Sequence, residues 1–171
     1  MDKMCCVDRL ECRMLEYYTL KDPSQIVHTL CVREYTRLLA RQEGYAAHQV
    51  SLLEIAALLH DIGCPQSKEK YGNSLPFNQE REGAVIAAEW LQQEVGLESS
   101  EREWVVAVVG SHHQFKRSRE LGFQVLFESD MIVNIQEGYY DRSQLWHYYD
   151  KMITTLSGQR LYRLLFGDPP K

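Results

Sequence analysis

The sequence has 171 residues, of which 44% are hydrophobic and 25% are charged, and its formal net charge at pH 7 is -5. This length fits one domain with a sizeable core better than it fits two. The negative net charge argues against a protein that coats a nucleic-acid backbone, so duplex nucleic acid is not expected as a partner. A small anionic ligand held by a few cationic side chains is compatible with this charge.

Two further features bear on the expected location of the protein. No stretch approaches about 20 uncharged apolar residues, and residues 1–6 lack the apolar region and the cleavage pattern of a signal peptide. The cysteines are odd in number and irregularly spaced, which indicates reduced thiols rather than a disulfide framework. We therefore expect a cytoplasmic protein that does not bind a membrane.

Helical periodicity dominates the chain, and strand-like alternation is nearly absent. An apolar stripe predicts a first helix that ends near Lys21. Asp22 and Pro23 suit the N-cap and the first position of a second helix, and Gly44 suits its end. His28 lies on or beside the apolar face of this second helix.

A third helix is expected over about residues 48–62. It is apolar around most of its circumference, which predicts the central, most buried helix, and it ends on His60 and Asp61. Burying an unpaired carboxylate costs on the order of several kcal/mol. The pair therefore needs a partner, and a divalent cation is the simplest partner for both side chains.

The segment after the third helix is polar and rich in turn-forming residues. Residues 66–76, which include Lys68 and Lys70, are expected to form a surface loop near the helix end, and such loops often close over ligands. A fourth helix is expected over about residues 78–95. Its first two turns carry three polar side chains, Gln79, Glu80 and Glu82.

The remaining elements are also helical. A fifth helix starts at Ser99 or Ser100 and has His112 and His113 at its C-terminal end, and the basic segment 116–119 follows. A sixth helix over about residues 123–136 carries Asp130 among core residues, and one or two amphipathic helices are expected over residues 141–166. The sequence thus predicts an all-α bundle of about six to eight helices.

Four candidate metal ligands come from three separate helices: His28, His60, Asp61 and Asp130. Imidazole and carboxylate groups suit Fe, Mn, Co, Ni or Zn and leave coordination positions for water and substrate. Taken alone, either histidine is better read as a core residue bonded to a backbone carbonyl, and Asp130 as the partner of an arginine. The four residues taken together favour a metal site. Each of the three helices places a polar group, which is costly to bury, on an otherwise apolar face.

The order of these motifs resembles the HD-domain superfamily of metal-dependent phosphohydrolases over about residues 22–137. It runs from His28 to Leu-Leu-His-Asp-Ile-Gly, then to His112-His113, then to Glu-Ser-Asp-Met-Ile-Val-Asn, which contains Asp130. The resemblance implies an all-helical domain of the HD type in which His28, His60, Asp61 and Asp130 bind a divalent metal. It also implies hydrolysis of phosphoester bonds in nucleotides or related compounds. We expect a single domain over residues 1–171, with the helices of residues 141–166 packed on its core.

The resemblance also bears on the number of ions. Family members with two or three metals often carry a further histidine four residues before a Gly-Ala pair on the helix after the HD motif. Here Gly83 and Ala84 mark this place, and Gln79 stands at the matching position, so one ion is expected rather than two. Glu80 or Glu82 would either replace that ligand, contact bound water, or be an exposed charge near a helix N-terminus.

His112 and His113 allow three interpretations: a second cation site, a hydrogen bond to a substrate phosphate, or a cap on the fifth helix, whose negative end favours protonated imidazole. Adjacent side chains on a helix point about 100° apart, so the two are not expected to face one ion. His112 is the better candidate for a catalytic role because it matches the first histidine of the family's His-His pair. His113 is expected to contact substrate.

The cations beside these motifs are candidates for phosphate binding. Lys116, Arg117 and Arg119 either face solvent or bind a substrate phosphate, and their closeness to His112 favours binding. An arginine would give the more specific contact, because its planar group matches phosphate oxygens. Lys68 has a similar but weaker claim, and Lys70 shares it.

The leading hypothesis is a phosphohydrolase that cleaves a phosphoester of a small substrate, most readily a nucleoside monophosphate, by metal-activated water. Its expected catalytic set is Asp61, which also binds the metal, His112, which protonates the leaving oxygen, and Glu82 or Glu80, which orients the water. The alternatives are a hydrolase of a cyclic nucleotide or an alarmone, a non-catalytic sensor that binds metal and nucleotide, and a helical interaction protein without metal. The aromatic residues of the last helices are compatible with a homo-oligomer.

Overall fold

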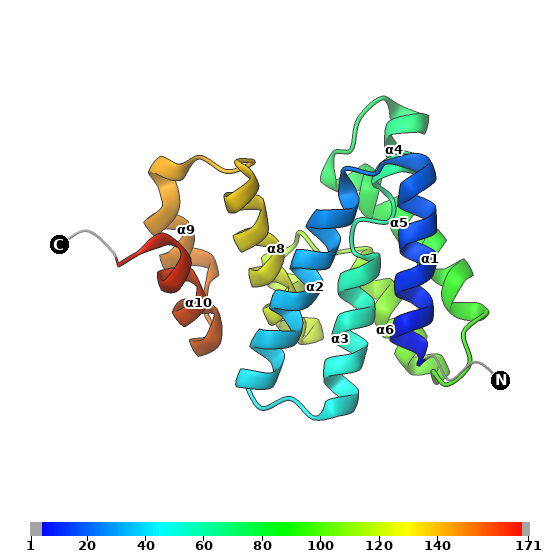
Figure 1. Ribbon diagram of the computed structural model, residues 1–171, viewed down its shortest axis with the longest axis horizontal. Helices are drawn as coiled ribbons and strands as arrows, with labels where there is room; N and C mark the ends of the chain where they lie inside the picture. The colour runs from blue at the N-terminus through cyan, green and yellow to red at the C-terminus, as the bar shows by residue number, and fades with distance from the viewer. Residues whose placement is uncertain (1–4, 169–171) are drawn as a thin grey trace.

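The computed structural model describes residues 5–168, which form ten α-helices and one 3-10 helix and contain no β-strand (Figure 1). The all-α prediction is confirmed, although the helices outnumber the six to eight expected. The predicted single domain stays a prediction, and its residues 1–4 and 169–171 lie outside the described part. The helices are α1 (Cys6–Lys21), α2 (Gln25–Gln42), α3 (Ala47–Leu59), α4 (Cys64–Tyr71), α5 (Pro76–Gln92), α6 (Ser99–Val109), α7 (Phe115–Leu121), α8 (Gln124–Glu137), η1 (Arg142–Gln144), α9 (Leu145–Met152) and α10 (Leu156–Phe166).

Two short helices account for the difference in number. The loop expected over residues 66–76 is wrong, because most of it is helical: Pro65 lies in the first turn of α4, and Gly72 ends α4 with a φ of 70°. The basic segment after His113 forms α7, which ends at Gly122 with a φ of 77°. Each helix spans only about two turns, too short for a hydrophobic period to be recognised.

Helix α3 lies at the centre of the bundle, as its apolar composition predicted. It packs against α1, α2, α6 and α8, and every residue from Leu53 to Leu59 is buried. Figure 1 shows it between α1 and α2. Its C-terminal end therefore delivers His60 and Asp61 into the interior. Over residues 5–168, no helix is both long and apolar enough to cross a bilayer.

A close backbone contact fixes the turn after α3 against α5. A Cβ atom on Gly63 would collide with the carbonyl oxygen of Gln79 and the amide nitrogen of Gly83. The φ of Gly63 is -81°, which any residue can adopt, so the close approach explains the glycine and the dihedral angle does not. This contact holds the His-Asp turn beside the first two turns of α5.

Two carboxylates attach the last helices to the rest of the bundle. Oε1 of Glu128, on α8, accepts hydrogen bonds from the backbone amides of Thr154 at 2.7 Å and Thr155 at 3.0 Å. Glu43, after α2, accepts a bond from the backbone amide of Ser157 at 2.7 Å. Helix α10 thus packs against α2 and α8, and these carboxylates satisfy three amides at or just before its start.

Candidate metal centre

The four candidate ligands converge in space. His28 lies on α2, His60 and Asp61 lie at the end of α3, and Asp130 lies on α8. Nε2 of His28 is 3.2 Å from Nε2 of His60 and 3.3 Å from Oδ1 of Asp130, and the His60–Asp130 distance is 3.6 Å. These separations would place one cation in reach of all three side chains.

Asp61 joins this group to a second one. Its Oδ2 atom lies 3.4 Å from Nε2 of both His28 and His60, and its Oδ1 atom lies 3.3 Å from Nε2 of His112. The ligand atoms of Asp61, His112 and His113 lie within 4.8 Å of one another. One carboxylate therefore stands between two sets of imidazoles.

The second group corrects the expectation that His112 and His113 cannot face one ion. Helix α6 ends at Val109, so both histidines lie in a turn, where the 100° rotation of a helix does not apply. Their ring centroids are 3.9 Å apart, and both rings contribute atoms to the group with Asp61. The C-terminal boundary of α6 decides this geometry.

Two of the imidazoles are oriented by the backbone of their own elements. Nδ1 of His60 lies 2.7 Å from the carbonyl oxygen of Ala57, and Nδ1 of His112 lies 2.9 Å from that of Val109. A carbonyl oxygen only accepts, so each Nδ1 carries a proton, and in the neutral ring the lone pair of Nε2 points towards the candidate ligand group. This is the tautomer that a metal-binding imidazole needs.

The other two imidazoles are oriented by carboxylates. Nδ1 of His28 lies 2.8 Å from Oε2 of Glu137, and Nδ1 of His113 lies 3.2 Å from Oε1 of Glu80. Sequence reasoning missed Glu137, and it expected Glu80 to be a ligand, a water contact or an exposed charge. Such carboxylate–histidine pairs commonly fix the orientation of metal ligands and raise their basicity.

Gln79 and Glu82 have partners of their own. The amide nitrogen of Gln79 lies 2.8 Å from Nε2 of His113, and its oxygen accepts a bond from the thiol of Cys64. Gln79 thus engages the ring atom that His113 would offer to an ion. Glu82 accepts hydrogen bonds from Tyr71 and Lys70 and does not line the cleft described below.

The electrostatics of the buried group favour a bound cation. Burial lowers the pKa of His60, but Asp61 and Asp130 outweigh this effect and hold that pKa well above its usual range. Burial raises the pKa of Asp61, but the charge of His60 is the largest opposing effect, and that pKa lies well below its usual range. For Asp130, hydrogen bonds from His28 and His60 likewise overcome burial and lower the pKa. In the metal-free protein, protonated imidazole supplies the positive charge that these carboxylates need.

Two buried atoms within the group are left without a hydrogen bond: Oδ1 of Asp61 and Nε2 of His112. They lie 3.3 Å apart, but both are acceptors when the His112 proton is on Nδ1. Burial, followed by the charge of His113, lowers the pKa of His112, which keeps this ring neutral. Buried polar atoms are rarely unsatisfied, and a cation bound at Asp61 would supply the positive charge that these two acceptors lack.

A cleft of about 880 Å³ opens onto the group at His28, Asp61 and His113. This volume is typical of small-molecule sites. The rest of its wall comes from the start of α2, from α4 and the α4–α5 connection, and from the end of α8 and the segment after it. These residues are Ser24, Gln25, Cys64, Lys68, Ser74, Leu75, Pro76, Gln79, Asn134, Glu137, Tyr139 and Tyr140.

The cleft contains some of the predicted substrate-binding residues and not others. His113 and Lys68 line it, and Nζ of Lys68 lies 2.7 Å from Oδ2 of Asp22. Lys116, Arg117 and Arg119 lie on α7, outside this lining. Lys116 and Arg117 instead pair with Glu120, at 3.6 and 3.0 Å. His112 is buried next to Asp61 and does not reach the cleft wall.

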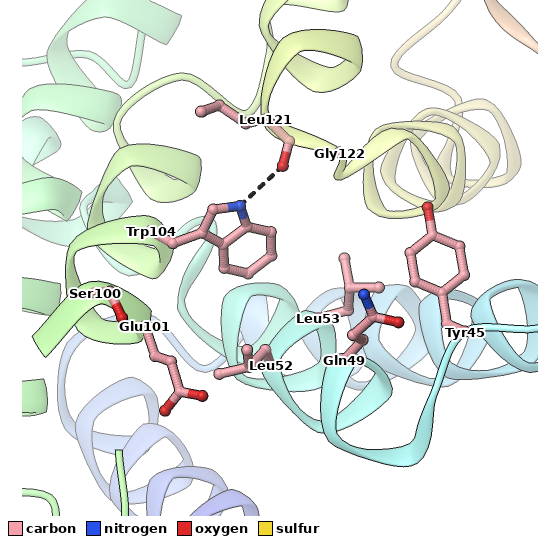
Figure 2. Close-up of a pocket in the computed structure, with 9 residues that line it drawn as sticks. All are labelled: Tyr45, Gln49, Leu52, Leu53, Ser100, Glu101, Trp104, Leu121 and Gly122. Atoms are coloured by element: carbon pink, nitrogen blue, oxygen red, sulfur yellow. Dashed lines mark hydrogen bonds between the residues drawn. The ribbon is translucent and has the colours of Figure 1, made fainter. Parts of the chain in front are cut away.

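A second cavity, of about 380 Å³, lies apart from the histidines (Figure 2). Its wall is largely apolar, and Nε1 of Trp104 donates to the carbonyl oxygen of Leu121 at 2.8 Å. Its acidic residue, Glu101, accepts a bond from His48. Among the residues that the structure describes, the lining of this cavity contains no histidine or cysteine and one carboxylate, so it offers no comparable set of ligands.

Comparison with known proteins gives one match. A family model described as HD domain matches residues 26–157, most of the chain, and this range includes every histidine and aspartate of the two groups. Comparisons with curated proteins and with solved structures gave no match. The extent of the family match, over the motifs that converge at the candidate metal centre, shows that the chain belongs to the HD domain family.

Proposed function

We propose that this protein is a metal-dependent phosphohydrolase that cleaves a phosphoester of a small substrate, most readily a nucleoside monophosphate. The observation that supports this is the position of Asp61. One of its carboxylate oxygens faces His28 and His60 at 3.4 Å, and the other faces His112 at 3.3 Å. Two buried atoms of this group, Oδ1 of Asp61 and Nε2 of His112, have no hydrogen bond within the described part of the chain, which is compatible with a cation bound at Asp61.

His28, His60, Asp61 and Asp130 would hold a divalent cation of the Fe, Mn, Co, Ni or Zn type. When bound, such a cation supplies Lewis-acid chemistry, because it lowers the pKa of water and polarises a phosphoryl oxygen. Asp61, His112 and His113 form a further group suited to a cation. We retain one ion as the proposal, because Gln79 engages Nε2 of His113.

The proton for the leaving oxygen is assigned to His113 in place of His112. His113 lines the cleft, whereas His112 is buried beside Asp61. Burial lowers the pKa of His113, but the hydrogen bond to Glu80 and the charges of Asp130 and Asp61 outweigh it and leave the pKa raised. The ring would carry the proton on Nε2 once substrate displaces the side-chain amide of Gln79 from that atom. Glu82 has no part in the proposal, because its carboxylate is bonded to Lys70 and Tyr71.

Lys68 would bind the substrate phosphate. Its ammonium group lies at the cleft wall and forms an ion pair with Asp22, and its side chain is 48% exposed. Solvent screens an ion pair whose ammonium group is this exposed, so a phosphate oxygen could replace Asp22 as the partner of Lys68.

The test combines metal content with turnover. We expect purified protein to contain a divalent metal and to release phosphate from nucleoside monophosphates when Mn, Co, Ni or Fe is added. The variants Asp61→Ala and Asp61→Asn should lose both the metal and the hydrolysis, and the asparagine variant keeps the side-chain shape so that misfolding can be separated from lost ligation. Full activity in metal-free Asp61→Ala protein would disprove the proposal, and ligand binding without turnover under every metal would indicate a sensor.

A further inference from the structure

The charge of the cleft limits the number of phosphates it can accept. Among the described residues that line it, Lys68 is the one lysine and none is an arginine. Lys68 already faces Asp22, and the cleft wall also carries Glu137, which is 30% exposed as a side chain. Sites for polyphosphates use several arginines and lysines, often in bidentate contacts. The cleft has cationic partners for one phosphate group beyond what the metal centre would bind.

The same cleft has an apolar part away from the histidines. Leu75 comes from the connection between α4 and α5, Pro76 is the first residue of α5, and Tyr139 and Tyr140 come from the connection between α8 and η1. Leu75 is 61% exposed and Tyr139 is 75% exposed. Large apolar residues exposed around a cleft indicate a binding surface more than a stability role.

The two tyrosines differ in how firmly they are held. The ring of Tyr140 packs edge-on against Tyr148, with centroids 5.3 Å apart and an interplanar angle of 76°. It is half-buried and forms a fixed wall. Tyr139 directs most of its surface to solvent, and aromatic rings of this kind stack on nucleobases or other flat ring systems.

We infer that the cleft selects phosphate monoesters whose organic part is a flat ring system, with Tyr139 and Leu75 as the residues that determine this preference. The inference rests on the proposed phosphohydrolase function. The phosphate lies between the metal centre, His113 and Lys68, and the ring system lies against Leu75 and Tyr139. Water adds to phosphorus, the ester phosphorus–oxygen bond breaks, and the leaving oxygen takes a proton, so the products are orthophosphate and an alcohol.

A matched set of substrates separates the two parts of the inference. Adenosine 5′-monophosphate and ribose 5-phosphate share the leaving oxygen and differ in the base, while adenosine 5′-triphosphate keeps the base and adds charge. We expect kcat/KM for the monophosphate to exceed that for ribose 5-phosphate by about 5-fold or more, because one base–aromatic contact contributes on the order of 1–3 kcal/mol and about 1.36 kcal/mol is tenfold in rate. The triphosphate should be turned over more slowly than the monophosphate.

Single substitutions then assign the preference to residues. Tyr139→Ala and Leu75→Ala should each reduce the ratio of the two kcat/KM values towards one. Phe77→Ala is the control, because Phe77 is 71% exposed and close in sequence to Leu75 but does not line the cleft. In this variant the ratio of kcat/KM for the monophosphate to kcat/KM for ribose 5-phosphate should not change.

The outcomes distinguish the inference from the function on which it rests. Equal kcat/KM for the monophosphate and ribose 5-phosphate, or faster turnover of the triphosphate, would overturn the inference while leaving the phosphohydrolase proposal intact. Absence of turnover with every metal would overturn the phosphohydrolase proposal. In that case calorimetry decides the selectivity: tighter binding of adenosine 5′-monophosphate than of ribose 5-phosphate, lost in Tyr139→Ala, would support it, and equal binding would overturn it.

Discussion

Nδ1 of His28, on α2, lies 2.8 Å from Oε2 of Glu137, the last residue of α8. Asp130, whose Oδ1 lies 3.3 Å from Nε2 of the same ring, is two turns earlier on α8. One helix therefore presents a candidate ligand and also the carboxylate that orients a ligand from another helix. The packing of α2 against α8 brings all three side chains together.

Replacing Glu137 should weaken metal binding without removing a ligand. Glu137→Gln keeps the size of the side chain but removes the charge that raises the basicity of His28, and loss of such a partner typically lowers metal affinity about 10- to 100-fold. The affinity can be measured by competition with a chromophoric chelator. Glu120→Gln, at an exposed glutamate of α7, is the control and should bind metal like the unmodified protein. Unchanged affinity in Glu137→Gln would show that the contact does not act on the metal.

The four candidate ligands were recognisable in the sequence because each is a polar residue on an otherwise apolar helix face. Glu137 and Glu80 were not recognisable in these roles, because a glutamate near a helix end is commonly exposed and nothing local records which helix packs beside it. The pairing of His112 with His113 depended on where α6 ends, and helix boundaries are poorly defined by sequence patterns. Asp61 and Asp130, by contrast, were found without knowledge of any contact.

Metal binding should release protons and weaken at low pH. Burial lowers the pKa of His28 and of His60, but their aspartate neighbours leave both pKa values raised in the metal-free protein. Only the neutral ring binds a metal, so affinity is full above the raised pKa values and falls as the pH drops through them. The loss should therefore begin above pH 6.5, the usual histidine value. Calorimetry in buffers of different ionisation enthalpy measures the protons released, and a pH-independent affinity between pH 6 and 8 would contradict this prediction.

Glu128 should be important for attaching the C-terminal helices. It is fully buried and accepts bonds from the backbone amides of Thr154 and Thr155. Glu128→Ala would leave these donors unpaired, at a cost of about 1–3 kcal/mol each where they stay buried. We expect a lower free energy of unfolding in urea, and faster proteolysis between α9 and α10. An equivalent change at exposed Glu120 should shift stability by no more than about 0.5 kcal/mol, so a similar effect of both changes would argue against the attachment role.

The glycine after the His-Asp pair should tolerate no side chain. In Gly63→Ala the new methyl group would overlap the backbone of α5 at Gln79 and Gly83, and neither atom belongs to a flexible side chain that could move. Overpacking of this kind costs about 1–3 kcal/mol or more, and relief by backbone movement would shift Asp61 away from His112. We therefore expect a lower urea midpoint together with weaker metal binding.

Gly110→Ala provides the comparison for Gly63→Ala. Gly110 also lies beside α5, but a Cβ atom there would lie 3.3 Å from the carbonyl oxygen of Val106 and 3.4 Å from the Cβ of Ala84. Its φ of -73° suits alanine, so a shift of a few tenths of an ångström accommodates the methyl group. The two variants add the same atoms to the same region, and they differ in whether the obstacle is an immovable backbone. Equal midpoints for both would show that the Gly63–Gly83 contact does not hold the His-Asp turn in place.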